Sequence, residues 1–482
     1  MTKTIKVLFL AAEAAPFVKI GGLGDVAGAL PAALRALSET DTDGVKLDVR
    51  LALPLHMVIR TESATLRPVA SFSIKRANKD ISTQIYETRS GDLPVYFVAG
   101  EPITTSGSVY SANPALDGEK YTFFSLAALE MTKHLDWQPD IVHVNDWHTA
   151  LAAYALQIKN WDGEMRGTKS LLTVHNLPFL GPDVTGRLAA YGLPLAQSDL
   201  PEWARAMPLP LGLWSAGKIV AVSPSYAEEM LTDEFGAGLE NYLIEHKSSL
   251  TGIINGIDTD FFNPATDEGI STNFTAETLS ERIWNKTALQ KTMGLDVNTS
   301  IPLFGLISRM DTQKGIDLAI DTLNKMKGEK WQAVILGTGD PLLEKRAKRL
   351  EEKFPDQVKV EIRYDGRLAR KIYAGSNIFL MPSRYEPCGL SQMIAMRYGC
   401  LPVVRATGGL KDTVKHAETG FVFNGDQPKD FLKAINAALE IYENQPYWQS
   451  LQRNAMAEDF SWKNSALEYV ALYRSLLLHE GF

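Results

Sequence analysis

Two glycine pairs, one toward each end of the chain, are candidate anion-binding sites. Lys19 stands two residues before the first pair, Gly21 and Gly22, and Thr407 stands directly before the second pair, Gly408 and Gly409. A glycine pair lets the backbone turn without a Cβ penalty, and the apolar periodicity after each pair predicts a helix that starts there. A helix start presents unpaired N–H groups and a partial positive charge. The pairs therefore predict two sites that could hold one phosphorylated ligand from both sides, with two plain turns as the alternative.

Two cations, Arg309 and Lys314, follow the apolar run 303–307. A guanidinium group offers a planar fork to two oxygens, and an ammonium group adds a mobile point charge. Together they could hold a diphosphate. The alternative is an ordinary surface ion pair.

A carboxylate, Glu386, lies between Tyr385 and Pro387 in a loop that opens a predicted helix at residues 389–392. It could accept hydrogen bonds from the hydroxyl groups of a ligand, and the alternative is a helix N-cap. Cys388 in the same loop has no histidine nearby in the sequence, so we interpret it as structural.

Metal and nucleotide-cofactor chemistry find little support in the sequence. His143 and His175 are candidate metal ligands by residue type, but no second histidine or cysteine stands at the spacing of a zinc site. The chain has neither G-x-G-x-x-G nor G-x-x-x-x-G-K-S/T. The main signatures of dinucleotide oxidoreductases and P-loop proteins are therefore missing, and we expect no metal and no cofactor.

Short apolar runs, each followed by turn residues and a helical pattern, must position these groups. In the first half they are residues 47–53, 95–99, 141–144, 171–174 and 219–222, and in the second 303–307, 333–336, 358–362, 378–381 and 401–404. Such runs are typical of buried parallel strands, so we predict two doubly wound α/β domains. Ligands collect at the carboxyl ends of such strands, which adds Asp146 and His175 to the candidate site residues.

The domain boundary is predicted at the turn-rich segment 255–267. We expect an N-terminal domain over residues 1–254, a C-terminal domain over 255–457 and a final segment over 458–482. An amphipathic helix is predicted over 461–479, with no indication of where it packs. The first helix, after Gly22, contains Pro31, which either kinks the helix or lies in the first turn of a continued one.

Composition limits the partners. The 482 residues are 45% hydrophobic and 22% charged, with a net charge of −8. An acidic balance does not favour nucleic acid, and no apolar stretch has the length of a transmembrane helix. The apolar run 7–12 ends at Glu13, so we predict a buried strand rather than a secretory signal. Only two cysteines, Cys388 and Cys400, are present, which fits a reducing, cytoplasmic setting.

Taken together, the motifs resemble the bacterial glycogen synthases and plant starch synthases. The matching words, in order along the chain, are residues 19–25 (KIGGLGD), 145–148 (NDWH), 173–176 (TVHN), 255–258 (NGID), 263–267 (NPATD), 313–315 (QKG), 382–390 (PSRYEPCGL) and 407–410 (TGGL). The resemblance implies a GT-B fold, with two Rossmann-like domains and a last helix that returns to the first. It also implies transfer of glucose from ADP-glucose to the non-reducing end of an α-1,4-glucan, with retained configuration and without a metal.

The resemblance further implies a role for each candidate residue. The diphosphate would be held by Lys19, Gly21 and Gly22 of the first domain and by Arg309, Lys314, Thr407, Gly408 and Gly409 of the second. The glucose would be held by Glu386, Cys388, Gly389 and Leu390, with Asp146 and His175 from the first domain and Asn255 from the linker. By position, Tyr364 matches the aromatic residue that stacks on adenine. The cations would stabilise the departing diphosphate electrostatically, in place of a magnesium ion.

The chain departs from the family pattern at two places. Ile394 stands where many retaining GT-B enzymes have a ribose-binding glutamate, and residues 178–181 (PFLG) replace the usual AYQG. Three alternatives therefore stay open: a GT-B transferase with UDP-glucose or a short oligosaccharide acceptor, a catalytically silent glucan-binding relative, and a phosphorylase-like enzyme. The last would need a longer chain and a lysine-bound pyridoxal phosphate.

Overall fold

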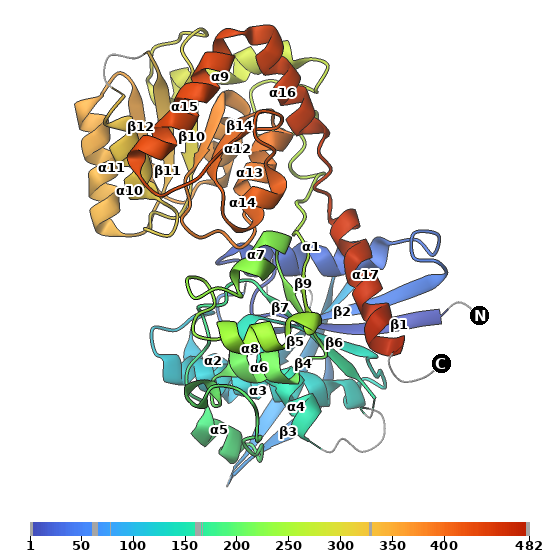
Figure 1. The fold of residues 1–482 in the computed structure, drawn as a ribbon. Coiled ribbons are helices and arrows are strands. Elements are labelled where there is room, and N and C mark those ends of the chain that lie inside the picture. Colours follow the sequence, from blue (N-terminus) through green and yellow to red (C-terminus); the bar gives the residue numbers. More distant parts are fainter. Residues whose placement is uncertain are drawn as a thin grey trace. The chain divides into compact units, whose positions relative to one another are not determined.

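The computed structural model of the chain describes residues 3–59, 66–77, 79–159, 165, 167–326 and 330–478. The chain divides into two compact units (Figure 1). The N-terminal unit comprises Met1–Gly256 together with Trp462–Phe482, and the C-terminal unit comprises Ile257–Ser461. His479, the predicted end of the last helix, lies outside the described residues, as do the outermost residues of the predicted terminal domains.

The N-terminal unit is built on a sheet with the strand order β3-β4-β5-β2-β1-β6-β7-β8-β9. The strands are β1 (Lys3–Leu10), β2 (Val45–Pro54), β3 (Arg67–Arg76), β4 (Lys79–Ser90), β5 (Leu93–Ala99), β6 (Ile141–Asn145), β7 (Lys169–Val174), β8 (Lys218–Ala221) and β9 (Leu250–Gly252). The strand predicted at residues 7–12 is confirmed as β1, which is paired in parallel with both β2 and β6.

One edge of this sheet departs from the prediction of parallel strands. β4 runs antiparallel to both β3 and β5. Along β4, exposed and buried residues alternate at first, unlike the continuously buried β5. The sequence analysis selected continuous apolar runs, which neither the alternating β4 nor the mostly exposed or half-buried β3 contains.

Helices cover both faces of this sheet. They are α1 (Gly22–Ala36), α2 (Glu101–Ser106), α3 (Pro114–His134), α4 (Asp146–Ile158), α5 (Thr185–Ala190), α6 (Pro208–Ser215), α7 (Pro224–Glu229), α8 (Glu240–Glu245) and α17 (Trp462–Leu478). α1 packs against α17, and α3 and α6 both pack against α4. α1 continues through Pro31, which therefore lies inside the helix rather than in its first turn.

The C-terminal unit has a fully parallel sheet in the order β12-β11-β10-β13-β14-β15. Its strands are β10 (Leu303–Ile307), β11 (Gln332–Gly337), β12 (Val358–Ile362), β13 (Ile378–Met381), β14 (Leu401–Arg405) and β15 (Phe421–Phe423). Numbered within this unit, the order is 3-2-1-4-5-6, the arrangement of a dinucleotide-binding fold. The predicted strands of the second half are confirmed.

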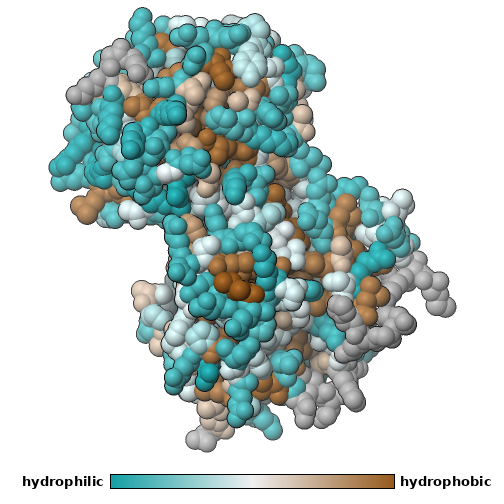
Figure 2. Space-filling view, in the orientation of Figure 1, coloured by the Kyte–Doolittle hydropathy of each residue, from teal (hydrophilic) through white to brown (hydrophobic). Residues whose placement is uncertain are grey.

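The helices of this unit are α9 (Arg282–Met293), α10 (Ile316–Leu323), α11 (Pro341–Lys353), α12 (Gly366–Gly375), α13 (Ser391–Arg397), α14 (Gly408–Thr413), α15 (Pro428–Glu443) and α16 (Gln445–Ala457). α10 contacts α11 and α15, whereas α12 contacts α9 and α13. Hydrophilic side chains cover most of the visible surface of each unit, with small separate apolar patches (Figure 2). Among the described residues, no helix is both long and apolar enough to cross a membrane.

A buried histidine joins the last helix to the sheet of the N-terminal unit. His143 on β6 is fully buried, with Nδ1 at 2.7 Å from the hydroxyl of Tyr473 on α17 and Nε2 at 2.8 Å from Oγ1 of Thr173 on β7. Burial lowers the pKa of His143 well below its usual range, so the ring is neutral. A neutral imidazole has one donor and one acceptor, and this site uses both.

We therefore expect Tyr473→Phe to destabilise the N-terminal unit by about 1–3 kcal/mol, because it leaves a buried ring nitrogen without a partner. Urea denaturation measures the change, and the midpoint of the unfolding transition of the N-terminal unit is the readout. Tyr447→Phe removes a hydroxyl from an exposed tyrosine of α16 and is the control. Equal midpoints for the two variants would contradict the anchoring role of His143.

Candidate active site

The topology gathers polar loops at one position in each sheet. In the N-terminal unit, β2 pairs with one edge of β1 and β6 with the other. The loops after β1 and β6 therefore diverge toward opposite faces of the sheet, which opens the crevice where doubly wound folds bind ligands. The loop after β1 carries Lys19, Gly21 and Gly22, and Asp146 directly follows β6.

The first glycine pair opens α1 as predicted, but a carboxylate already binds its backbone. Gly21 is the N-cap of α1 and has extended backbone angles. Its amide donates to both carboxylate oxygens of Glu13, at 3.1 and 3.2 Å, and the Ile20 amide also donates to Glu13. Lys19 forms an ion pair with Asp25, with Nζ at 2.8 Å from Oδ1. The Gly21 amide, which the resemblance assigns to a diphosphate, is thus engaged within the protein here.

Glu13 is a site residue that the sequence analysis missed as such. It appeared there only as the residue that ends the first apolar run. It is almost fully buried, and a buried carboxylate directly after a parallel strand was the signal that could have found it.

Asp146 lies at the start of α4 in a left-handed backbone conformation, with φ of 53°. Its Oδ1 accepts the backbone amides of His175, at 2.7 Å, and of Asn176, at 3.3 Å. Burial raises the pKa of Asp146 to about 7, and the charge of Glu13 acts in the same direction. The structure therefore brings Asp146 and His175 together and places a carboxyl group there that titrates near neutral pH.

The hydrogen bonds around His175 define its tautomer. Nε2 of His175 is 2.9 Å from Oδ1 of Asn145, while Nδ2 of Asn145 donates to the carbonyl of Leu10. Since the amide oxygen accepts, Nε2 carries the proton and Nδ1 is an acceptor. Enclosure by the protein lowers the pKa of His175 to about 3. His175 is therefore neutral at physiological pH and acts through hydrogen bonds rather than charge.

Two buried amide oxygens in this unit have no hydrogen-bond partner among the described residues. They are Oδ1 of Asn176 and Oδ1 of Asn255. An unsatisfied buried acceptor is costly, and a hydroxyl group of a ligand would satisfy it. The sequence analysis placed Asn255 in the site but did not single out the side chain of Asn176.

In the C-terminal unit, the corresponding position lies between β10 and β13. Lys314, from the loop after β10, contacts Glu386, from the loop after β13, at 2.8 and 2.6 Å. Oε2 of Glu386 also accepts a bond from the hydroxyl of Ser383 at 3.0 Å. Only 18% of the Lys314 side chain and 6% of the Glu386 side chain are exposed. Lys314 is therefore not part of an ordinary surface ion pair, and Glu386 does not cap the following helix.

The loop after β10 approaches the loop after β13 closely because of a glycine. Gly315 has φ of 67°, and a Cβ there would lie 2.1 Å from the carbonyl oxygen of Pro382. Arg309 is more peripheral: 63% of its side chain is exposed, and its guanidinium lies 3.3 Å from Asp311. Asp311 also accepts the backbone amide of Lys314 at 2.8 Å, so this carboxylate links Arg309 to the backbone of the Lys314 loop.

The second glycine pair permits backbone packing against the Glu386 loop. A Cβ on Gly408 would lie 2.1 Å from the carbonyl oxygen of Glu386, and one on Gly409 would lie 2.2 Å from that of Cys388. The Gly409 amide donates to the carbonyls of Glu386 and Pro387. The helix predicted after this pair is present as α14, but the Gly409 amide is engaged by the loop rather than directed at a ligand. Cys388 is buried.

Two further positions that the sequence analysis singled out, Tyr364 and Ile394, differ in accessibility. Tyr364 is 81% exposed and precedes Asp365, which caps the N-terminus of α12, so its ring is open to stacking. Ile394, the position at which the sequence analysis noted a departure, is buried on α13. No cluster of three metal-ligating side chains occurs among the described residues.

Comparison with known proteins identifies the family. Residues 6–245 match the model of the starch synthase catalytic domain, and residues 295–455 match that of glycosyl transferases group 1. A glycogen synthase of Thermotoga petrophila is 42% identical over 99% of this chain and 100% of its own length. A glycogen synthase of Streptococcus pneumoniae is 37% identical over 98% of this chain and 100% of its own.

Solved structures agree. The catalytic domain of starch synthase IV from Arabidopsis thaliana, bound to ADP and acarbose, superposes with a TM-score of 0.89 at 32% identity, over 98% of this chain and 100% of that one. Sucrose-phosphate synthase from Thermosynechococcus elongatus, at 18% identity and a TM-score of 0.63 over 99% of this chain and 100% of that one, shares the fold. The expected GT-B fold is confirmed, and the chain belongs to the glycogen and starch synthase family of glycosyltransferases.

Proposed function

We propose that the enzyme transfers glucose from ADP-glucose to the non-reducing end of an α-1,4-glucan, with retention of the anomeric configuration. The observation that carries the proposal is the similarity, over 98% of this chain, to the catalytic domain of a starch synthase bound to ADP and acarbose. ADP is the product that an ADP-glucose donor leaves, and acarbose is an oligosaccharide. Tyr364, with its exposed ring, is proposed to stack on the adenine.

The proposed chemistry is electrostatic. Lys314 and Arg309, with Lys19 from the N-terminal unit, would stabilise the charge that develops on the departing diphosphate, and no metal is required. Glu386 would accept glucose hydroxyl groups, supported by Cys388, Gly389 and Leu390. His175, neutral with Nε2 held by Asn145, is proposed to bind the sugar through Nδ1. Asp146 and the unsatisfied Oδ1 of Asn255 would complete these contacts.

Retention is proposed to proceed on one face of the sugar, with the leaving phosphate accepting the proton of the attacking hydroxyl. The hydrogen bonds of Glu386 support this route over a covalent intermediate. Its Oε1 accepts from Lys314, and its Oε2 accepts from both Lys314 and Ser383. Carboxylate lone pairs engaged in this way are poor nucleophiles.

The proposal also covers the cellular location of the enzyme and the length of its glucan acceptor. The cytoplasmic location stays a prediction from the cysteine usage, and Cys388 and Cys400 are both buried. The departure at residues 178–181 includes Phe179, whose ring is exposed. We expect this segment to influence the length of glucan that the enzyme accepts.

Nucleotide release tests the donor and the acceptor directly. We expect ADP release from ADP-glucose with glycogen to exceed UDP release from UDP-glucose by at least about tenfold, with maltose as the short acceptor for comparison. UDP release that equals or exceeds ADP release would overturn the donor assignment. Glycogen binding without any nucleotide release would identify a silent glucan-binding relative instead.

Lys314→Ala and Glu386→Ala should each lower kcat by about 100- to 1000-fold, because each removes a group that acts on charge or hydroxyls at the reacting sugar. The loss of stability should be smaller than the loss of turnover, since Ser383 still donates to Glu386 in the Lys314 variant and Asp311 still accepts the Lys314 amide in the Glu386 variant. Steady-state kinetics and calorimetry measure the two effects. Arg346→Ala, which breaks an exposed pair with Asp321 in the same unit, is the control. Loss of cooperative unfolding in either variant would count against the assignment to the active site.

The raised pKa of Asp146 predicts a pH-dependent stability. Its pKa rises from 3.8 to about 7, so the folded state holds the proton more tightly than the unfolded state. Stability from this group is present below about pH 4 and is lost as the pH rises to about 7. Relative to Asp146→Asn, the wild-type free energy of unfolding should therefore fall by up to about 4 kcal/mol across this range.

Asparagine also tolerates the left-handed conformation, so this substitution leaves the backbone unstrained. Asp136→Asn makes the same change at an exposed residue that also has positive φ and controls for backbone effects. A constant difference between wild type and Asp146→Asn from pH 4 to 7 would refute the assignment.

A further inference from the structure

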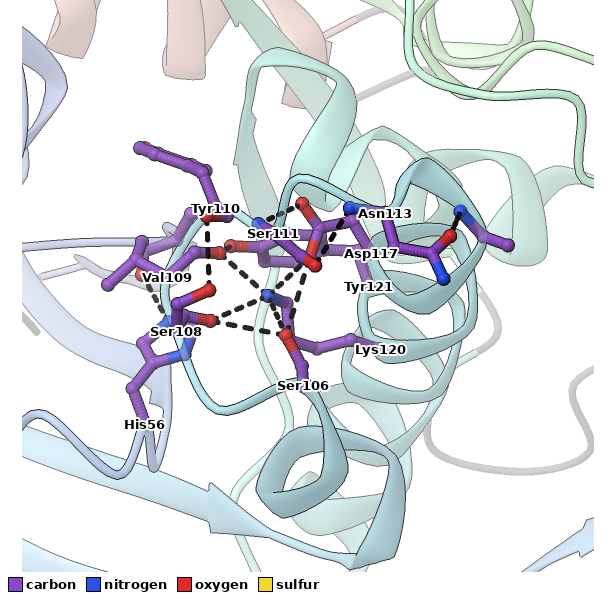
Figure 3. A network of polar contacts seen from close by, with 12 residues as sticks. His56, Ser106, Ser108, Val109, Tyr110, Ser111, Asn113, Asp117, Lys120 and Tyr121 are labelled. Carbon is purple, nitrogen blue, oxygen red and sulfur yellow. Dashed lines mark hydrogen bonds and ion pairs between the residues drawn. The ribbon is translucent and has the colours of Figure 1, made fainter.

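A buried ammonium group lies at the centre of a polar network in the N-terminal unit (Figure 3). The side chain of Lys120, on α3, has no exposed surface. Its Nζ lies 2.7 Å from Oδ1 of Asp117, 2.8 Å from Oγ of Ser106, 2.9 Å from the carbonyl of Ser108 and 2.7 Å from that of Val109. An ammonium group has three protons and no acceptor, so these partners use its full capacity.

These bonds fasten one short segment, residues 106–111, onto α3. Asp117 adds a bond from the Ser111 amide at 2.8 Å, and the Tyr121 hydroxyl donates to the carbonyl of Val109 at 2.6 Å. A helix ion pair alone needs only Asp117 and Lys120, three residues apart. Here the ammonium group donates mostly to the hydroxyl of Ser106 and to the carbonyls of Ser108 and Val109. Its main effect is therefore to hold residues 106–111 in place.

The fixed segment carries Tyr110, and Tyr110 leads to the first glycine pair. The Tyr110 hydroxyl donates to Oε1 of Glu13 at 2.9 Å. Glu13 in turn accepts the amides of Ile20 and Gly21 at the start of α1. Lys120 is therefore linked to the loop that carries Lys19 by its bond to the carbonyl of Val109, by the covalent backbone from Val109 to Tyr110, and by the hydrogen bonds of Tyr110 and Glu13.

We propose that Lys120 is a positioning residue for transfer: it fixes Tyr110, which orients Glu13 and thereby sets the backbone of residues 19–22. This inference rests on the proposed function, because that function places the Lys19 loop beside the diphosphate. Misplacement of such a loop lowers the rate far more than it lowers substrate binding, because the contact strengthens as charge develops on the leaving group.

The full chain with Lys120→Met tests the inference. We expect kcat to fall by about 10- to 100-fold, while the donor KM changes by less than about threefold. Tyr110→Phe removes only the hydroxyl that reaches Glu13 and should lower kcat in the same way. Because the two residues act in series, the double variant should be about as slow as the slower single variant. Lys133→Met removes a half-exposed lysine from the same helix and is the control.

Hydrogen exchange supplies a readout that does not depend on the donor. Amide exchange in residues 17–24 should accelerate in Lys120→Met and in Tyr110→Phe, and should stay at the wild-type rate in Lys133→Met. A purely structural role would lower the melting temperature and leave kcat of the folded protein unchanged. If Lys120→Met does not fold, Ser106→Ala removes a single partner of the ammonium group. This variant should show a smaller fall in kcat and a smaller acceleration of amide exchange in residues 17–24.

Folded Lys120→Met with wild-type kcat, or effects of Lys120→Met and Tyr110→Phe that multiply in the double variant, would overturn the inference. Unchanged exchange in residues 17–24 would overturn it whichever donor the enzyme uses. Failure of the wild type to release ADP from ADP-glucose would instead refute the proposed function, and the exchange experiment would still decide whether Lys120 orders the loop.

Discussion

The position in each sheet where the strand order reverses is the constraint on which the candidate site depends. On either side of β1 in one unit and of β10 in the other, the chain must leave toward opposite faces of the sheet. The loops therefore separate, and polar groups can gather there without breaking the apolar packing beneath them. Asp146, at the start of α4 directly after β6, occupies such a position in one unit, and the loops that carry Lys314 and Glu386 occupy it in the other.

Buried charge at these positions is stabilised in two different ways. Lys314 and Glu386 are opposite charges in contact, and a hydroxyl satisfies part of the remaining capacity. Asp146 has backbone amides as its partners, and its raised pKa indicates that these do not fully offset the cost of burial. A carboxyl group that is hydrogen-bonded but not ion-paired can change its protonation near neutral pH. In the proposed site, Asp146 is therefore the group most sensitive to pH, and neutral His175 is not.

The sequence predicted the parts of the fold that have a one-dimensional signature. Continuous apolar runs located the parallel strands, and the starts of α1 and α14 followed from their glycines. The antiparallel strands β3 and β4 were not predicted because β3 is mostly exposed or half-buried and β4 begins with an alternation of exposed and buried residues. In the site, residue types indicated Lys314 and Glu386 but not their mutual contact, which depends on the close approach at Gly315. The hydrogen bond between Glu13 and the Gly21 amide could likewise not be predicted from the sequence, since it depends on the conformation of the folded loop.

Each cation proposed to act on the diphosphate has a carboxylate partner of its own. Lys19 is paired with Asp25, Arg309 with Asp311 and Lys314 with Glu386. A diphosphate would therefore compete with carboxylates rather than meet free positive charge, and part of the attraction would be offset by the pairs it breaks or shares. The cost of breaking these pairs is the same for the bound donor and for the transition state, whereas the electrostatic gain is larger in the transition state, because the leaving diphosphate carries more charge than the bound donor. Paired cations of this kind thus favour catalysis over tight donor binding.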